Sequence, residues 1–147
     1  MKEIWKTIPL FPNYQISNLG RVKSLWFKKE KILSVCIANG YKVVNLRIDK
    51  IKFVEKISFL MLITFIGLKP KGKEVSHLNN NRLDDRLENL KWETHQENMK
   101  RIIKLKEIKI IQIEKLIEKD YLLYSIANKF NVSLSTIKRI KRRMKNE

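Results

Sequence analysis

The sequence predicts an α+β protein in three parts: a small β-rich unit, a central strand–loop–strand–helix unit and an all-helical C-terminal unit. Residues 1–57 contain short, partly alternating apolar segments separated by turn signals, which is typical of strands. Residues 58–102 contain a buried-helix pattern, then two strand-like segments around a polar loop and a helix start. Residues 103–147 show helical spacing of apolar residues.

The β-rich part is expected to be a meander with a turn at residues 18–20. Strands are expected at residues 14–17, 21–25, 32–38, 41–48 and 52–57. Asn39-Gly40 is a strong hairpin signal, because both residues tolerate positive φ. Cys36 lies among Val35, Ile37 and Ala38 and is expected to be a small residue of the core.

The central part begins with a helix expected at Ser58–Ile66, with Ser58 as its N-cap and Gly67 at its end. Glu74–His77 predicts a short strand and Leu87–Trp92 a returning strand across a polar loop. Thr94 is a suitable cap for the helix that follows. The order strand, loop, strand, helix defines a ββα unit.

The C-terminal part begins with an amphipathic helix that is expected to end near Asp120. Two shorter helices follow, separated at Asn131, which can take the left-handed conformation usually given to glycine. Ser133 is the expected N-cap of the second helix, and Ala127 lets the two helices approach closely. Their small core is expected to contain Ile126, Phe130, Val132, Ile137 and Ile140.

Charge narrows the possible partners. The 147 residues include 32 Lys and Arg against 15 Asp and Glu, a formal net charge of +17. Such an excess favours polyanions, either nucleic acid or an anionic membrane, although a solubilising surface is the alternative explanation. The apolar stretch 57–68 is too short to span a bilayer. Nucleic acid is therefore the expected partner, with no membrane association.

Cysteine content and the first residues bear on location. The single cysteine excludes an internal disulfide and a multi-cysteine zinc cage, so no structural zinc is expected. The first six residues lack the apolar region of a signal peptide. We therefore expect an intracellular protein that is not secreted.

One spacing pattern stands out in the first part. Its members are Glu3, Trp5, Lys6, Ile8, Phe11, Tyr14, Ser17, Asn18, Gly20 and Val22. They follow in register the pattern Glu-x-Trp-Lys-x-Ile-x-x-Phe-x-x-Tyr-x-x-Ser-Asn-x-Gly-x-Val, and so this part resembles the N-terminal NUMOD4-type module of HNH homing endonucleases. The resemblance implies a small β-rich module that lies against DNA. Arg21, Lys23 and, from the next part, Arg82 are the expected DNA contacts.

The central part resembles the HNH motif of the same family. The usual form is Val-(Asn/Asp)-His-x-Asp-Gly-Asn-x-x-Asn-Asn-Arg-x-Glu-Asn-Leu-x-Trp, and residues 75–92 follow it, with a further match at residues 94–98. The resemblance implies that His77 is the general base and that Asn89 holds the loop bearing it. Asn98 and Ser76 fall at the positions that ligate one divalent cation, Mg²⁺ or Mn²⁺.

Three departures from the family pattern bear on activity. Ser76 stands where relatives usually carry Asp or Asn, and a neutral hydroxyl is a poorer ligand for Mg²⁺. Ser58 stands where relatives usually carry His, and Asn79-Asn80 replaces Asp-Gly. Cleavage could therefore be weakened or lost while DNA binding persists.

Residues 122–140 resemble a resolvase-like helix-turn-helix. Its second helix would offer side chains to a major groove, and the basic residues after it would contact phosphates. The expected DNA-binding residues here are Ser135, Thr136, Lys138, Arg139, Arg142 and Arg143. A basic helical hairpin that contacts other proteins is the alternative.

Three functions are consistent with these patterns. The first is a site-specific DNA endonuclease of mobile-element type that acts as a monomer, with an oligomer not excluded. The second is an inactive DNA-binding protein on the same scaffold. The third, less favoured, is a basic RNA-binding structural protein.

Overall fold

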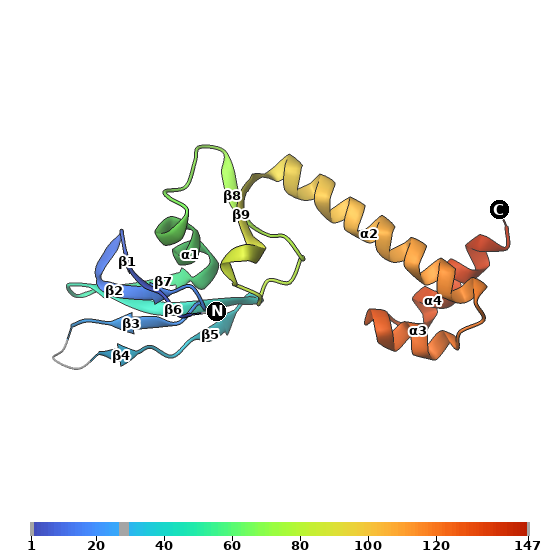
Figure 1. Ribbon diagram of the computed structural model, residues 1–147, viewed down its shortest axis with the longest axis horizontal. Coiled ribbons are helices and arrows are strands. Elements are labelled where there is room, and N and C mark those ends of the chain that lie inside the picture. The colour runs from blue at the N-terminus through green and yellow to red at the C-terminus, as the bar shows by residue number, and fades with distance from the viewer. Residues whose placement is uncertain (1, 27–29, 147) are drawn as a thin grey trace. The chain divides into compact units, whose positions relative to one another are not determined.

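The computed structural model describes residues 2–26 and 30–146, which form two compact units that divide after Asn98. Within these ranges the first unit contains strands packed around a helix and the second unit is helical, so the α+β class is confirmed (Figure 1). The boundary expected between residues 57 and 58 lies inside the first unit. Residues on both sides of it contribute to one hydrophobic core.

The first unit contains three antiparallel sheets, and the first two follow each other in chain order. The first sheet consists of β1 (Trp5–Ile8), β2 (Phe11–Ser17), β3 (Val22–Ser24) and β4 (Lys31–Ile32), and the second of β5 (Cys36–Ala38), β6 (Tyr41–Ile48) and β7 (Ile51–Lys56). Strand β1 was not expected. The single strand expected at residues 32–38 is divided between the two sheets, because β4 pairs with β3 and β5 pairs with β6.

Of the predictions for the second sheet, the one for its turn is confirmed and the one for its cysteine is wrong. Asn39 and Gly40 connect β5 to β6 with φ of 51° and 78°, which confirms the predicted hairpin. Cys36 is exposed, so its expected place in the core was wrong. The reason is its position on β5, an edge strand whose three residues are all exposed.

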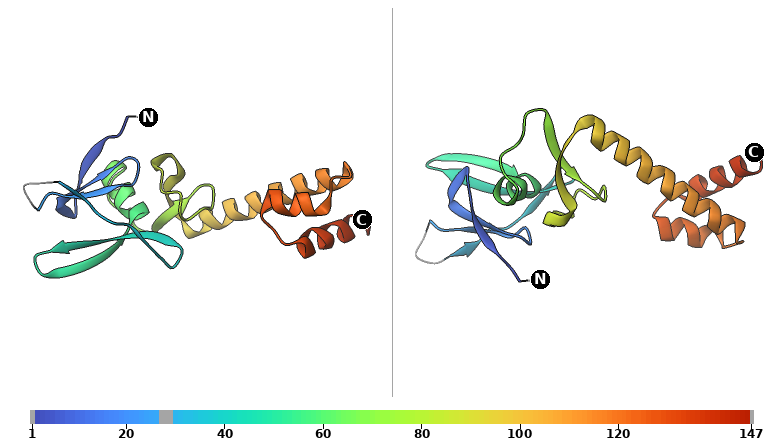
Figure 2. Two further views of the ribbon diagram at one scale, coloured as in Figure 1. Left: turned by 90° about the horizontal axis from the view of Figure 1, so that it is seen from below. Right: turned by 45° about the horizontal axis from the view of Figure 1, so that its top comes forward.

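Helix α1 (Ile57–Phe65) is the centre of the first unit and contacts β1, β2, β6, β7, β8 and β9 (Figure 2). It begins one residue earlier than expected, and Lys56 occupies the N-cap position without a side-chain bond. The expected cap at Ser58 was therefore wrong. Ser58 lies within the first turn and is only 2% exposed, because this helix is buried on nearly every side.

A hairpin of β8 (Lys73–His77) and β9 (Leu90–Thr94) packs against α1. The returning strand is shorter than expected, because Leu87–Asn89 form a 3-10 turn in which the Asn89 N–H bonds to the Arg86 carbonyl. Trp92 connects the hairpin to α1. Its ring meets Phe59 edge-on at 6.1 Å, and its indole N–H donates to the Gly67 carbonyl at 3.2 Å.

Helix α2 (His95–Glu118) is continuous across the point where separate helices were expected. No Gly or Pro occurs within it to break the backbone pattern. Its start is confirmed as a reciprocal cap, in which Thr94 Oγ1 accepts from the Glu97 N–H and the Glu97 carboxylate accepts from the Thr94 N–H. The latter bond holds the pKa of Glu97 below its ordinary value.

The second unit packs the end of α2 with α3 (Leu123–Phe130) and α4 (Leu134–Met144). Asn131 ends α3 with φ of 49°, and the Ser133 side chain accepts from the Thr136 N–H at the start of α4, as predicted. The buried core contains Ile113, Ile117, Ile126, Ala127, Ile137 and Ile140, with Phe130 and Val132 packed partly against it. In the described ranges, none of the helices combines the length and apolar character needed to cross a membrane.

Candidate functional site

The loop between β8 and β9 is held by one buried side chain, Asn89. Its Oδ1 accepts from the Asn79 N–H at 2.9 Å, and its Nδ2 donates to Asn79 Oδ1 at 3.0 Å and to the Asp84 carbonyl at 2.7 Å. The neighbouring Asn80 takes a left-handed conformation with φ of 62°. These bonds join the two ends of the loop directly after the strand that carries His77.

A salt-bridged segment stiffens the same loop. Arg86 donates to both carboxylate oxygens of Asp84, and Asn79 Nδ2 donates to Asp84 at 2.8 Å. The Arg86 guanidinium, with help from Asn79, holds the pKa of Asp84 well below its ordinary range. Asp84 therefore remains ionised and keeps its partners at any pH near neutrality.

His77, the last residue of β8, pairs with a carboxylate. Its Nε2 lies 2.9 Å from Asp85 Oδ1, and the two side chains are only 5% and 4% exposed. The second oxygen of Asp85 is buried, and within the described residues it has no hydrogen-bond partner. An ionised carboxylate accepts hydrogen bonds and donates none. Its pairing with a neutral imidazole therefore selects the tautomer that has the hydrogen on Nε2 and the lone pair on Nδ1.

A second cluster lies on the opposite face of the hairpin, since successive strand residues alternate. The Ser76 hydroxyl donates to Asn98 Oδ1 at 3.2 Å, and Asn98 Nδ2 donates to Glu74 Oε1 at 3.2 Å. His95 Nδ1 lies 3.4 Å from the same Glu74 oxygen. Strand β8 and the first turn of α2 thus bring four polar side chains together.

The Ser76–Asn98 pair fits a small hard cation in its donor atoms and their spacing. Octahedral Mg²⁺ holds oxygen ligands at ~2.1 Å, so adjacent ligand oxygens lie about 3 Å apart. The Ser76 and Asn98 oxygens are 3.2 Å apart. Across residues 2–26 and 30–146, no three His, Cys, Asp or Glu side chains gather to hold a metal. A cation here would therefore need hydroxyl, amide, water or phosphate oxygens as well.

Cations and one aromatic ring lie beside His77. The Tyr41 ring is 6.2 Å from the imidazole, and Lys56 and Arg82 lie over Tyr41 at 3.8 and 5.1 Å. Tyr41 and Lys56 also line a hollow with Ser58, at the position where the family pattern has His. The predicted DNA contact Arg82 is exposed, and it contacts the same Tyr41 ring that lies beside the candidate base.

Two other predicted DNA contacts of the first unit are engaged within it. Arg21 pairs with Glu3, and this pairing holds the pKa of the Glu3 carboxyl below its ordinary value. Lys23 is 9% exposed, bonds to Glu30 at 2.9 Å and lies over the Trp5 ring at 4.7 Å. The structure therefore gives both residues intramolecular partners.

The predicted contacts of the second unit divide by exposure. Lys138 and Arg139 lie in the middle of α4 and Arg142 lies near its end, and all three are exposed. Ser135 and Thr136 bond to the capping hydroxyl of Ser133 at 2.8 and 2.9 Å. Arg143 pairs with Glu114 at 2.7 Å.

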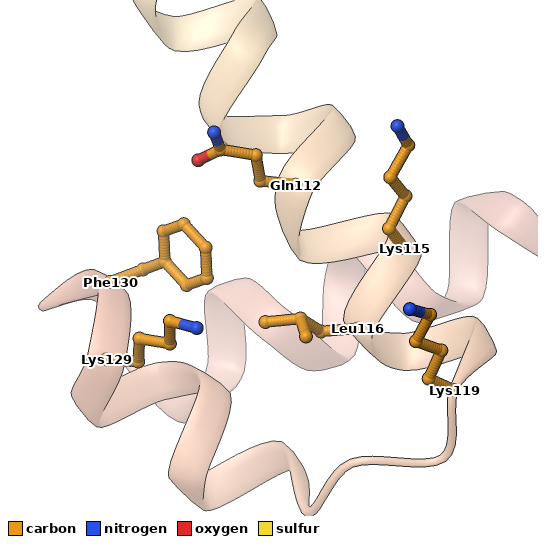
Figure 3. A pocket seen from close by; sticks show the side chains of 6 residues that line it. All are labelled: Gln112, Lys115, Leu116, Lys119, Lys129 and Phe130. Atoms are coloured by element: carbon orange, nitrogen blue, oxygen red, sulfur yellow. The ribbon is translucent and has the colours of Figure 1, made fainter.

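A further basic hollow of this unit lies between α2 and α3 (Figure 3). Gln112 and Leu116 of α2 face Phe130 and Lys129 of α3, and Lys115 and Lys119 lie along its α2 side. Three of the six residues that line it are lysines, and their positive charge favours an anionic ligand. Nothing in the sequence patterns pointed to this hollow.

Two residues of the first unit were missed by sequence reasoning. Asp85 stands at the second Asn of the family's Asn-Asn-Arg segment, so the departure itself was the available signal. Glu74 lies outside the motif as usually written. Its signal was the strand period of two, which places it on the face of Ser76.

Two segments of the chain match known protein families. Residues 3–47 match the NUMOD4 motif and residues 59–100 match the HNH endonuclease model. Two uncharacterized HNH endonucleases of Acanthamoeba polyphaga mimivirus are 41% and 32% identical over 69% and 64% of this chain, which spans 26% and 28% of their length.

A solved structure is similar as well. This structure concerns DNA binding and cleavage by the HNH homing endonuclease I-HmuI. Its TM-score is 0.62 and its sequence identity 27%, and the match covers 76% of this chain and 68% of that one. The chain therefore contains a segment that matches the NUMOD4 motif followed by a segment that matches the HNH endonuclease model, as its sequence pattern predicted.

Proposed function

We propose that this chain is a DNA endonuclease that hydrolyses a phosphodiester bond with one divalent cation, Mg²⁺ or Mn²⁺, and His77 as the general base. The observation that carries the proposal is a carboxylate-held imidazole immediately next in the strand to the Ser76–Asn98 oxygen pair. The HNH match and the similarity to a DNA-cleaving homing endonuclease support it.

His77 is suited to activate water through Nδ1. Asp85 accepts from Nε2 and fixes the ring's orientation and tautomer. When Nδ1 takes a proton from water, the buried carboxylate stabilises the resulting imidazolium. The hydroxide attacks phosphorus, and the bond to the leaving sugar oxygen breaks. Asp85 acts through His77 and is a positioning residue.

Ser76 and Asn98 would hold the cation, which when bound supplies positive charge to the phosphate and the leaving oxygen. Ser76 and His77 are consecutive residues at the end of β8, so the oxygens that would hold the cation and the candidate base come from the same short segment. Asn89 keeps the loop closed and so fixes the end of β8 that carries Ser76 and His77.

The proposal is tested by cleavage of a randomised duplex DNA library in Mg²⁺ and in Mn²⁺, with the cut ends sequenced. We expect recurrent cut sites with the unmodified protein. We expect His77→Ala to bind the same DNA with cleavage reduced about 10²–10⁴-fold, the usual contribution of a general base. Absence of cuts in either metal, at protein concentrations that shift the DNA, would refute the endonuclease.

A DNA-binding protein without cleavage is the second candidate, and Ser76 is the observation that favours it. A neutral hydroxyl replaces the usual acidic or amide ligand. This candidate predicts that His77→Ala leaves all measurable activity unchanged and that Ser76→Asp restores metal-dependent cutting.

We also propose that α4 binds double-stranded DNA as the reading helix of a monomeric protein. Its exposed cations Lys138, Arg139 and Arg142 suit the groove edge and phosphates. Lys138→Ala should weaken binding and reduce the slope of log affinity against log salt by about one. Lys104→Ala, which removes an exposed charge from α2, is the matched control. Equal losses for both variants would indicate attraction by net charge alone.

A further inference from the structure

Glu74 has no assigned role, although its carboxylate lies in the Ser76–Asn98 cluster. Its Oε1 accepts from Asn98 Nδ2 at 3.2 Å, and the side chain is 45% exposed. Glu74 precedes Ser76 by two residues on β8, so the strand period directs both to the same face. The contact of each with Asn98 agrees with that placement.

The Ser76–Asn98 pair carries no negative charge of its own. Ser76 and Asn98 are both neutral, and the chain as a whole is strongly cationic, at +17. Magnesium sites in proteins depend on one or two carboxylates beside waters and phosphates. A cation held by two neutral oxygens in this chain would therefore be bound poorly.

We infer that Glu74 supplies the anionic ligand of the metal site, in place of the acidic residue missing at position 76. The inference rests on the proposed metal-dependent function. Half exposure leaves the Glu74 side chain free to turn its carboxylate toward a cation shared with the Ser76 and Asn98 oxygens. His95, 3.4 Å from Glu74, flanks the same oxygen and suits Mn²⁺ better than Mg²⁺.

The alternative source of charge on this face is Glu93, which lies directly opposite Glu74 in the pairing register. Glu93 is 6% exposed and has its own interaction in the structure, whereas Glu74 is open to solvent. Exposure and the direct contact with Asn98 favour Glu74 as the ligand.

The test is Mn²⁺ binding by the full chain, followed through the electron paramagnetic resonance signal of free Mn²⁺. We expect Glu74→Gln to weaken binding by at least about tenfold, the lower bound for residues that support a metal site. Glu107→Gln, which removes an exposed charge from α2, should bind as the unmodified protein does. Adding Ser76→Asp to Glu74→Gln should restore binding, because it returns a carboxylate to the same face.

The outcomes separate this inference from the proposed function. If the unmodified protein and Glu74→Gln bind Mn²⁺ equally, Glu74 is not a ligand, and the metal-dependent endonuclease is unaffected. If the unmodified protein binds no Mn²⁺ at millimolar concentration, the inference is overturned, and the library cleavage assay then decides the proposed function on its own. Thermal melting without metal shows whether each variant is folded.

Discussion

Replacing Asn89 by Asp tests how much the loop closure contributes to stability. The change preserves shape and keeps an oxygen that can accept from the Asn79 N–H. It removes the amide group that donates to Asn79 Oδ1 at 3.0 Å and to the Asp84 carbonyl at 2.7 Å. It also places a negative charge beside those two acceptors.

The expected loss in the free energy of unfolding is about 2 kcal/mol, at about 1 kcal/mol for each lost hydrogen bond. Asn89 is only 6% exposed, so water does not readily replace the missing donor. Asn81→Ala is the matched control in the same loop. Its Oδ1 accepts a single bond from the Leu83 N–H at an exposed site, so its effect should stay within about 0.5 kcal/mol.

Urea unfolding followed by tryptophan fluorescence is the suitable assay. All three tryptophans, Trp5, Trp26 and Trp92, lie in the first unit, so the signal is insensitive to unfolding of the second. If Asn89→Asp and Asn81→Ala unfold at the same urea concentration, the loop is not held by the Asn89 bonds and the reasoning is refuted. On the proposed function, Asn89→Asp should also lose more cleavage than DNA binding.

Three further predictions follow from single contacts. Ser133→Ala should lower the stability of the second unit by about 1 kcal/mol through loss of the α4 cap, measured by circular dichroism at 222 nm. Cys36 should react with a disulfide reagent in the native protein about as fast as in urea, because it is exposed. NMR titration should find the Asp84 carboxyl ionised below its ordinary pKa of 3.8. Its pairing with Arg86 should stabilise the fold above that pH, with the stabilisation lost as the pH falls through the lowered pKa. In Arg86→Met, its pKa should return toward the ordinary value.

Local chemistry explains which elements could be predicted from sequence. Asn39-Gly40, the Thr94–Glu97 cap and the turn from Asn131 to Ser133 each depend on backbone conformations or bonds within a few residues. Such features are readable from sequence because their determinants are adjacent in the chain.

Cys36 and Ser58 were misplaced because tertiary position overrides local pattern. The apolar neighbours of Cys36 resemble a core strand, but β5 pairs on one side only and all its residues are exposed. Ser58 is a good capping residue by type, yet α1 begins earlier because both sheets and the hairpin surround it. Neither circumstance can be read from the type of the residue or of its immediate neighbours.

The candidate site was predictable where the family motif is matched, and incomplete where this chain departs from it. His77, Ser76 and Asn98 were found by register with the motif, whereas Asp85 and Glu74 were not, since the motif has Asn at one position and does not include the other. A carboxylate two residues upstream of its usual place lies on the same face of a strand, whereas a shift of one residue would reverse the face. A metal site can therefore exchange ligands along one face of β8 while its sequence motif appears broken. For this reason the substitution at Ser76 is by itself a weak argument for lost activity.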